Sequence, residues 1–142
     1  MMLEIESYAS AGPLKFGMGY DDVKSSLGEP LSQEKSRLGD TIVRYDGFGA
    51  TVADTGVVEA YFLPTTEVSV SGVEVYEDAH AFQKLCALDG APKEFLGFII
   101  LLKLGITLTG FHDGDQSQKA ITAFARGRWD RLSGEMKNYT MP

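Results

Sequence analysis

Residues 16–30 read FGMGYDDVKSSLGEP, a segment that marks both ends of a short helix. Gly19 stands at the N-cap, and Asp21 and Asp22 place negative charge beside the positive end of the helix dipole. Gly28 suits a left-handed residue after the last turn, and Pro30 prevents the helix from continuing. The segment therefore predicts a helix between Gly19 and Gly28.

A second helix is predicted over residues 79–88. Asp78 is its expected N-cap, and Asp89-Gly90 is its stop signal. Phe82, Leu85 and Cys86 form an apolar stripe along it. In the first helix Val23 and Leu27 share one face in the same way, and Phe16 or Met18 can pack against that face from outside.

Turn residues divide most of the remaining chain into strands. The predicted strands cover residues 3–8, 41–45, 48–53, 57–63, 68–76, 98–104, 106–111 and 120–126. Asp46-Gly47 indicates a tight hairpin, and Ser71-Gly72 indicates a turn or a bulge. The run 98–104 lacks alternation, which favours a central strand covered on both faces, with a buried helix as the alternative. Residues 32–40 are predicted as a polar connector, and residues 128–142 as an irregular tail docked by Trp129.

Each predicted helix precedes three predicted strands, which suggests a tandem helix-plus-meander duplication with half-units 16–64 and 68–127. At 142 residues the chain is predicted to form a single α+β domain, 1–142. The expected assembly is one antiparallel sheet of meanders, or two sheets joined edge to edge, with two helices on one face. The other face would be open to solvent or to a partner.

The N-terminus lacks the basic flank and apolar core of a signal peptide, and the longest apolar run is far shorter than the roughly 20 residues of a membrane span. The chain has one cysteine, so no intrachain disulfide is expected. These features predict a cytoplasmic protein.

The net charge of −7 arises in one segment of the chain. Between Arg44 and Lys84 there is no lysine or arginine, whereas outside this interval 13 acidic residues balance 13 basic ones. The seven acidic residues of the interval are Asp46, Asp54, Glu59, Glu67, Glu74, Glu77 and Asp78. Such a surface repels nucleic acid and anionic membranes, and it suits a basic protein partner. Solubility alone is the other explanation of the charge.

The candidate partner-binding residues combine these carboxylates with two tyrosines that can anchor an interface. They are Asp54, Glu59, Tyr61, Glu67, Glu74, Tyr76, Glu77 and Asp78.

The sequence gives little sign of catalysis, and we expect no enzyme, no metal and no cofactor. Cys86 lies in an apolar stripe on a different side of its helix from His80, so the two cannot form a dyad within the helix. Asp113, Asp115 and Ser117 match the first positions of a calcium loop, but the glycine and glutamate that the loop requires are absent. A turn is the favoured interpretation of residues 112–117.

The pattern of Gly17-Met18, Val23, Leu27-Gly28 and Pro30 resembles a helix of the SmpA/OmlA (BamE-like) superfamily. The two-unit layout is similar to that of beta-lactamase inhibitor protein. The superfamily's lipoproteins carry a lipidated cysteine near the start, and this chain has none there, so the resemblance implies no envelope role.

A longer resemblance, over residues 16–126, is to small cytoplasmic bacterial immunity proteins that neutralise toxins. It includes Tyr61-Phe62-Leu63-Pro64 after the first meander and the segment 104–108 near the end. This resemblance implies a toxin inhibitor, with the cognate basic toxin as partner. The alternatives are a BamE-like assembly module, which would form a homodimer through its sheet, and a small-molecule-binding or enzymatic domain using His112 and Asp113.

Overall fold

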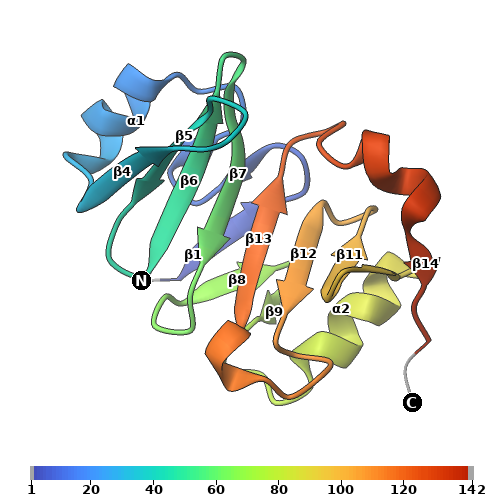
Figure 1. Ribbon diagram of the computed structural model, residues 1–142. Coiled ribbons are helices and arrows are strands. Elements are labelled where there is room, and N and C mark those ends of the chain that lie inside the picture. Colours follow the sequence, from blue (N-terminus) through green and yellow to red (C-terminus); the bar gives the residue numbers. More distant parts are fainter. Residues whose placement is uncertain (1, 141–142) are drawn as a thin grey trace.

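The computed structural model describes residues 2–140, in which two α-helices accompany a nine-stranded and a five-stranded sheet (Figure 1). The helices are α1 (Tyr20–Leu27) and α2 (Ala81–Asp89). The larger sheet has the order β14-β10-β11-β12-β13-β7-β6-β5-β4, and the smaller has the order β3-β2-β1-β8-β9. The predicted α+β class is confirmed.

The strands of the larger sheet are β4 (Ser32–Lys35), β5 (Thr41–Arg44), β6 (Phe48–Ala53), β7 (Gly56–Phe62), β10 (Lys93–Phe95), β11 (Phe98–Leu101), β12 (Ile106–Thr109), β13 (Ala120–Phe124) and β14 (Lys137–Asn138). Those of the smaller sheet are β1 (Leu3–Glu6), β2 (Ser10–Ala11), β3 (Leu14–Lys15), β8 (Val68–Val70) and β9 (Val73–Glu74). Two short 3₁₀ helices, η1 (Gln116–Gln118) and η2 (Asp130–Glu135), flank β13.

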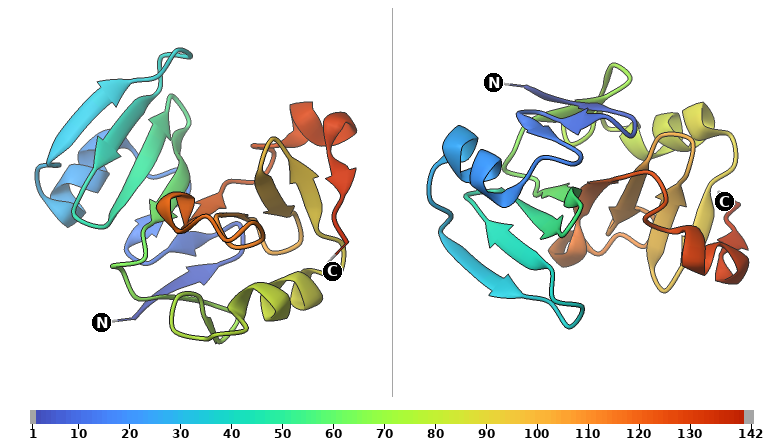
Figure 2. Two further views of the ribbon diagram at one scale, coloured as in Figure 1. Left: turned by 60° about the horizontal axis from the view of Figure 1, so that its bottom comes forward. Right: turned by 90° about the horizontal axis from the view of Figure 1, so that it is seen from above.

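The larger sheet consists of two antiparallel meanders joined edge to edge. Strands β4–β7 form one meander and β10–β13 the other, and they meet where β7 pairs with β13. Both helices and the five-stranded sheet cover the same face of this sheet (Figure 2). The core lies between these layers, where Ile5, Val70, Leu85 and Phe62 are buried in one cluster.

The segment before α1 attaches this helix to the larger sheet. The backbone N–H of Gly17 donates to Val57 O (3.0 Å), and Val57 N–H donates to Met18 O (2.9 Å). Gly19 has the extended conformation of an N-cap, and Gly28 follows the helix with φ 83°. The predicted helix and both of its ends are therefore confirmed.

Several sequence predictions need correction. Residues 32–40 are not all connector, because residues 32–35 form the edge strand β4. All four side chains of this strand are exposed, so its sequence shows no alternation of apolar and polar residues. The C-terminal tail is not irregular throughout, because β14 pairs with β10. Strand β10 and the five-stranded sheet were not expected. Asp78 is not the N-cap of α2: the helix begins at Ala81, and the Asp78 carboxylate accepts a hydrogen bond from His80 N.

Two other expectations are confirmed. The run beginning at Phe98 forms a strand rather than a helix, and Ile99, Ile100 and Leu101 are fully buried. Trp129 docks the tail, since its ring packs edge-on against Phe98 and two other aromatic rings.

Candidate functional site

The solvent-facing side of the five-stranded sheet carries a group of carboxylates. Glu4 on β1 lies opposite Ser69 on β8, and Ser69 lies opposite Glu74 on β9. The neighbours of these residues along each strand, such as Ile5 and Val70, are buried in the core. Because side chains alternate along a strand, Glu4 and Glu74 both point outward from one row.

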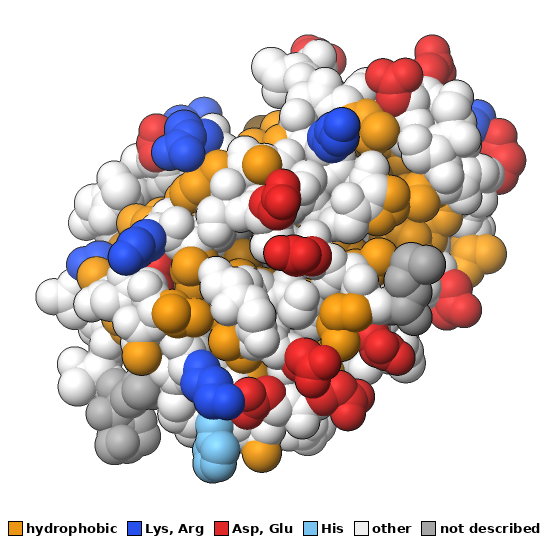
Figure 3. All heavy atoms as spheres, turned by 180° about the vertical axis from the view of Figure 1, so that it is seen from behind, with side chains coloured by type: hydrophobic (Ala, Val, Ile, Leu, Met, Phe, Trp, Pro, Cys, Tyr) orange, Lys and Arg blue, Asp and Glu red, His pale blue; other side chains and the backbone are white. Residues whose placement is uncertain are grey.

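Further acidic residues extend this group. Glu6 lies on the same side of β1, Glu67 directly precedes β8, and Glu77 follows β9; all three are exposed. We call Glu4, Glu6, Glu67, Glu74 and Glu77 the acidic face. Figure 3 shows acidic side chains gathered on this side of the molecule. Among the described residues, none of the five forms an ion pair with a lysine or arginine.

The acidic interval predicted from the sequence does not form one surface. Glu67, Glu74 and Glu77 belong to the acidic face, but Glu59 lies on β7, on the face of the larger sheet turned away from the five-stranded sheet. Tyr61 alternates with buried residues on the same strand and shares that far face. Asp54 is exposed in the turn between β6 and β7.

Tyr76 is an internal link between strands. Its hydroxyl donates to Phe62 O (2.5 Å) at the end of β7 and accepts from Ile121 N–H (3.0 Å) on β13. Burial raises the pKa of this hydroxyl. The side chain is half-buried, and the structure gives its polar group a role in joining the two meanders.

Asp78 lies beside the acidic face but is neutralised locally. Lys84 Nζ lies 2.5 Å from its carboxylate. The hydrogen bond from Lys84, together with the one from His80 N–H, lowers the pKa of Asp78. Its charge therefore contributes less to an external partner than the five unpaired carboxylates.

Sequence reasoning missed Glu4 and Glu6. They lie about 60 positions before Glu67, and the parallel pairing of β1 with β8 brings them beside the later residues of the acidic interval. The alternation of acidic and apolar residues in Leu3–Glu6 is the signal that indicates an outward-facing acidic side on this strand.

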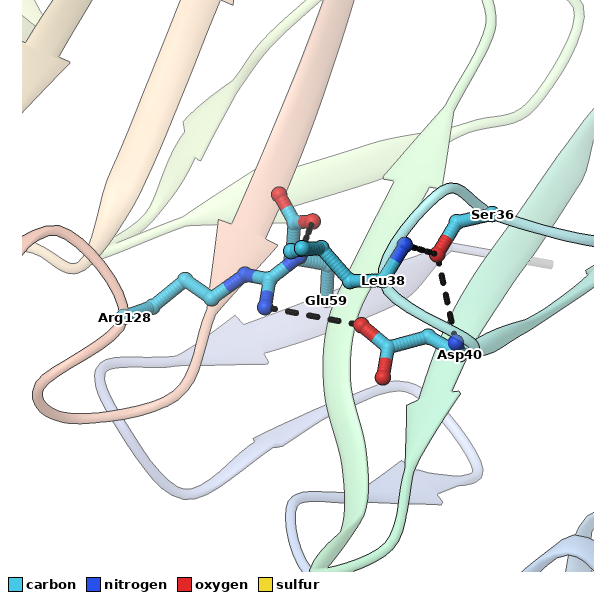
Figure 4. Close-up of polar contacts among 5 residues, drawn as sticks. All are labelled: Ser36, Leu38, Asp40, Glu59 and Arg128. Carbon is cyan, nitrogen blue, oxygen red and sulfur yellow. Dashed lines mark hydrogen bonds and ion pairs between the residues drawn. The ribbon is translucent and has the colours of Figure 1, made fainter.

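The far face of the larger sheet contains a groove that crosses the junction of the two meanders. Arg128, just after β13, places Nη2 2.8 Å from Glu59 Oε1 and Nη1 3.9 Å from Asp40 Oδ2 (Figure 4). Asp40 belongs to the loop between β4 and β5, so this arginine connects the two meanders. Leu38, at the tip of the same loop, is 75% exposed.

The loop of residues 112–117 is held by local contacts. Asp113 accepts from Asp115 N–H, and Asp115 accepts from the N–H and hydroxyl of Ser117. His112 is packed among aromatic rings, stacked on Phe82 and edge-on to Tyr139. Within residues 2–140, no group of three or more His, Cys, Asp or Glu side chains could hold a metal ion.

Cys86 is buried, and burial raises the pKa of its thiol to about 11. We expect alkylation of the native protein by iodoacetamide at about pH 8 to be at least about 100-fold slower than alkylation of the urea-unfolded chain, because the thiolate is the reactive species. Mass spectrometry of timed samples measures both rates. Native and unfolded rates within about tenfold of each other would contradict a sheltered thiol.

Among the described residues, no helix combines the length and apolar character that crossing a membrane requires. A comparison with protein families finds no match, and a comparison with curated proteins also finds none. The fold is similar to that of an extracellular protein containing an SCP domain from Bacillus anthracis str. Ames, solved by crystallography, with a TM-score of 0.54 and 18% identity. The match covers 82% of this chain and 46% of that chain, so this chain spans less than half of the other protein. At this identity the likeness concerns the fold alone.

Proposed function

We propose that this chain is a protein-binding inhibitor of the immunity type, which neutralises a basic bacterial toxin by docking the acidic face onto it. The observation that carries the proposal is the joining of β1 and β8–β9 into one outward sheet face, whose carboxylates form no ion pair with any lysine or arginine of residues 2–140. A toxin that acts on nucleic acid must attract phosphates, and a carboxylate surface competes for the same lysines and arginines.

The arrangement of the acidic face also favours fast association with a basic protein. Unpaired carboxylates on one face create a field that attracts a basic protein before contact and orients it. A sheet face presents these groups from a rigid backbone, so little conformational freedom is lost on binding. The single cysteine and the proposed toxin partner fit a cytoplasmic location, which belongs to this proposal.

We expect the association rate with the cognate toxin to fall at least about tenfold between roughly 20 and 150 mM salt. The toxin to test is the variable C-terminal domain of a secreted protein, if the neighbouring reading frame encodes one. Stopped-flow fluorescence or surface plasmon resonance with this domain measures the rate, and co-expression measures protection of growth. An association rate that is unchanged over this salt range would remove the electrostatic mechanism.

Two variants with the same change in net charge test whether the acidic face determines the association rate. Glu4→Lys/Glu74→Lys reverses two charges on the acidic face, whereas Asp54→Lys/Glu135→Lys makes the same charge change at exposed positions elsewhere. We expect the first variant to slow association at low salt by about tenfold or more, and the second to change it by less than about threefold. Equal effects of the two variants would show that net charge matters and the acidic face does not.

A further inference from the structure

The groove on the far face of the larger sheet divides into two adjoining hollows. The first, of about 380 Å³, has an apolar part formed by Leu38, Phe98, Trp129 and Leu132. Its polar lining residues are Glu59, Thr107, Thr122, Arg128 and Arg131. The second, of about 410 Å³, lies beside it. Its charged lining residues are Arg126, Arg128, Arg131 and Asp40. Leu38, Arg128 and Arg131 border both hollows, so the apolar and the basic hollow are continuous.

Two of the three arginines have no carboxylate partner among the described residues. Arg128 is engaged by Glu59 and Asp40, whereas Arg131 forms no ion pair and Arg126 lies over the ring of Tyr8, 4.3 Å from its centroid. The carboxylates of Glu59 and Asp40 also line the hollows, and Arg128 pairs with both, so Arg126 and Arg131 are the arginines left without an ion pair in the described part of the chain. Guanidinium groups bind carboxylates with paired hydrogen bonds, so an anionic ligand suits the second hollow.

The side chain of Trp129 lines the first hollow. The indole N–H of Trp129 is buried, and no residue in the range 2–140 accepts a hydrogen bond from it. Because this N–H is fully buried, the surface that Trp129 offers to a ligand is its ring rather than its donor. Phe98 is also partly exposed beside this ring, so the hollow offers aromatic surface to a ligand.

We propose that this groove binds an organic carboxylate, with the apolar part of the ligand in the hollow beside Trp129 and the carboxylate between Arg126 and Arg131. The size of the first hollow suits one aromatic or branched aliphatic group. The C-terminal residue of a peptide and a free small acid both present this chemistry. The site lies on the opposite side of the larger sheet from the acidic face and does not depend on the proposed function.

Trp129 is the only tryptophan in the chain, so its fluorescence reports directly on the groove. The test titrates the full chain with 4-phenylbutyrate and with 4-phenylbutanol, which has the same apolar part and no charge. We expect a saturable change in emission with the acid and at least about tenfold weaker binding of the alcohol. Chemical shifts of backbone amides at residues 122–132 provide a second readout if the emission does not respond.

Variants test the assigned roles without disturbing the core. Arg131→Gln and Arg126→Gln are each expected to weaken binding of the acid about three- to tenfold. Leu38→Ser, at a largely exposed position, is expected to weaken acid and alcohol equally. Lys15→Gln on β3 removes the same charge from the opposite side of the molecule and should leave the affinity unchanged.

An acetylated tripeptide ending in phenylalanine, as the free acid and as the amide, distinguishes the two sources of the carboxylate. Tighter binding of the peptide acid than of phenylbutyrate assigns the groove to peptide C-termini, and equal or weaker binding assigns it to small acids. The proposal is overturned if neither acid saturates either readout, or if the alcohol and the amide bind as well as the acids.

Discussion

Gly56→Ala is expected to lower the free energy of unfolding by about 3–5 kcal/mol, the largest loss we predict for a single methyl group in this chain. Gly56 has φ 108°, a backbone conformation that L-residues other than glycine rarely adopt. A Cβ at this position would lie 2.3 Å from the backbone carbonyl of Gly17. Strain and overlap therefore act together at the contact that attaches the segment before α1 to β7.

The backbone cannot shift to remove this overlap without breaking hydrogen bonds. Gly17 and Met18 form two backbone hydrogen bonds with Val57, so moving the segment away from the added methyl group breaks the attachment of α1. Urea denaturation followed by circular dichroism measures the loss. Native domains have a free energy of unfolding of about 5–15 kcal/mol, so the variant is expected to lose a large part of it.

Gly39→Ala is the matched control. Gly39 also has a positive φ, 88°, but a Cβ there would meet no atom within 4 Å. Only conformational strain is added at this position, so we expect a loss of about 1 kcal/mol. Equal losses in the two variants would show that strain alone accounts for Gly56 and that the close approach to Gly17 is unimportant.

Local signals predicted much of this fold. The glycines on either side of α1 and the Asp46-Gly47 turn between β5 and β6 act within a few residues, and the structure confirms them. Strands β4 and β14 escaped prediction because edge strands with exposed side chains need no apolar alternation. The five-stranded sheet depends on the parallel pairing of β1 with β8, and no local pattern specifies a partner so far along the chain.

The candidate site was predicted less well than the fold, for a related reason. Counting charges along the chain identified an acidic interval, but the direction of each side chain depends on strand pairing. Glu59 is neutralised by Arg128, which lies 69 positions away. Glu4, near the start of the sequence, joins the acidic face through the pairing of β1 with β8. Charge composition therefore suggests a basic partner as a hypothesis, whereas topology decides which carboxylates lie on one face.

The two surfaces differ in sign as well as in position. The acidic face is carried by the smaller sheet, and the free arginines border the groove on the far side of the larger sheet. A protein partner on the first and a small carboxylate on the second could bind at the same time. The core between them is one packed cluster, so the two sites are separated by rigid structure.

Tyr76→Phe is expected to lower the free energy of unfolding by about 2–3 kcal/mol and the melting temperature by about 6–10 °C. The substitution keeps the ring, which stacks on Phe111 with centroids 5.9 Å apart, and removes only the hydroxyl. Phe62 O and Ile121 N–H, which face each other across β7 and β13, then lose the group that connects them. Leaving buried backbone groups without partners costs more than the net value of a typical hydrogen bond.

Tyr61→Phe is the control for this prediction. Tyr61 lies on β7 as well, one position before Phe62, but its hydroxyl makes no hydrogen bond with any described residue. We expect its removal to change the free energy of unfolding by less than about 0.5 kcal/mol, measured by the same thermal and urea denaturation. If Tyr76→Phe is as mild as Tyr61→Phe, the hydroxyl of Tyr76 does not hold the meanders together. The prediction from the sequence that Tyr76 binds a partner would then explain this residue better than a role in stability.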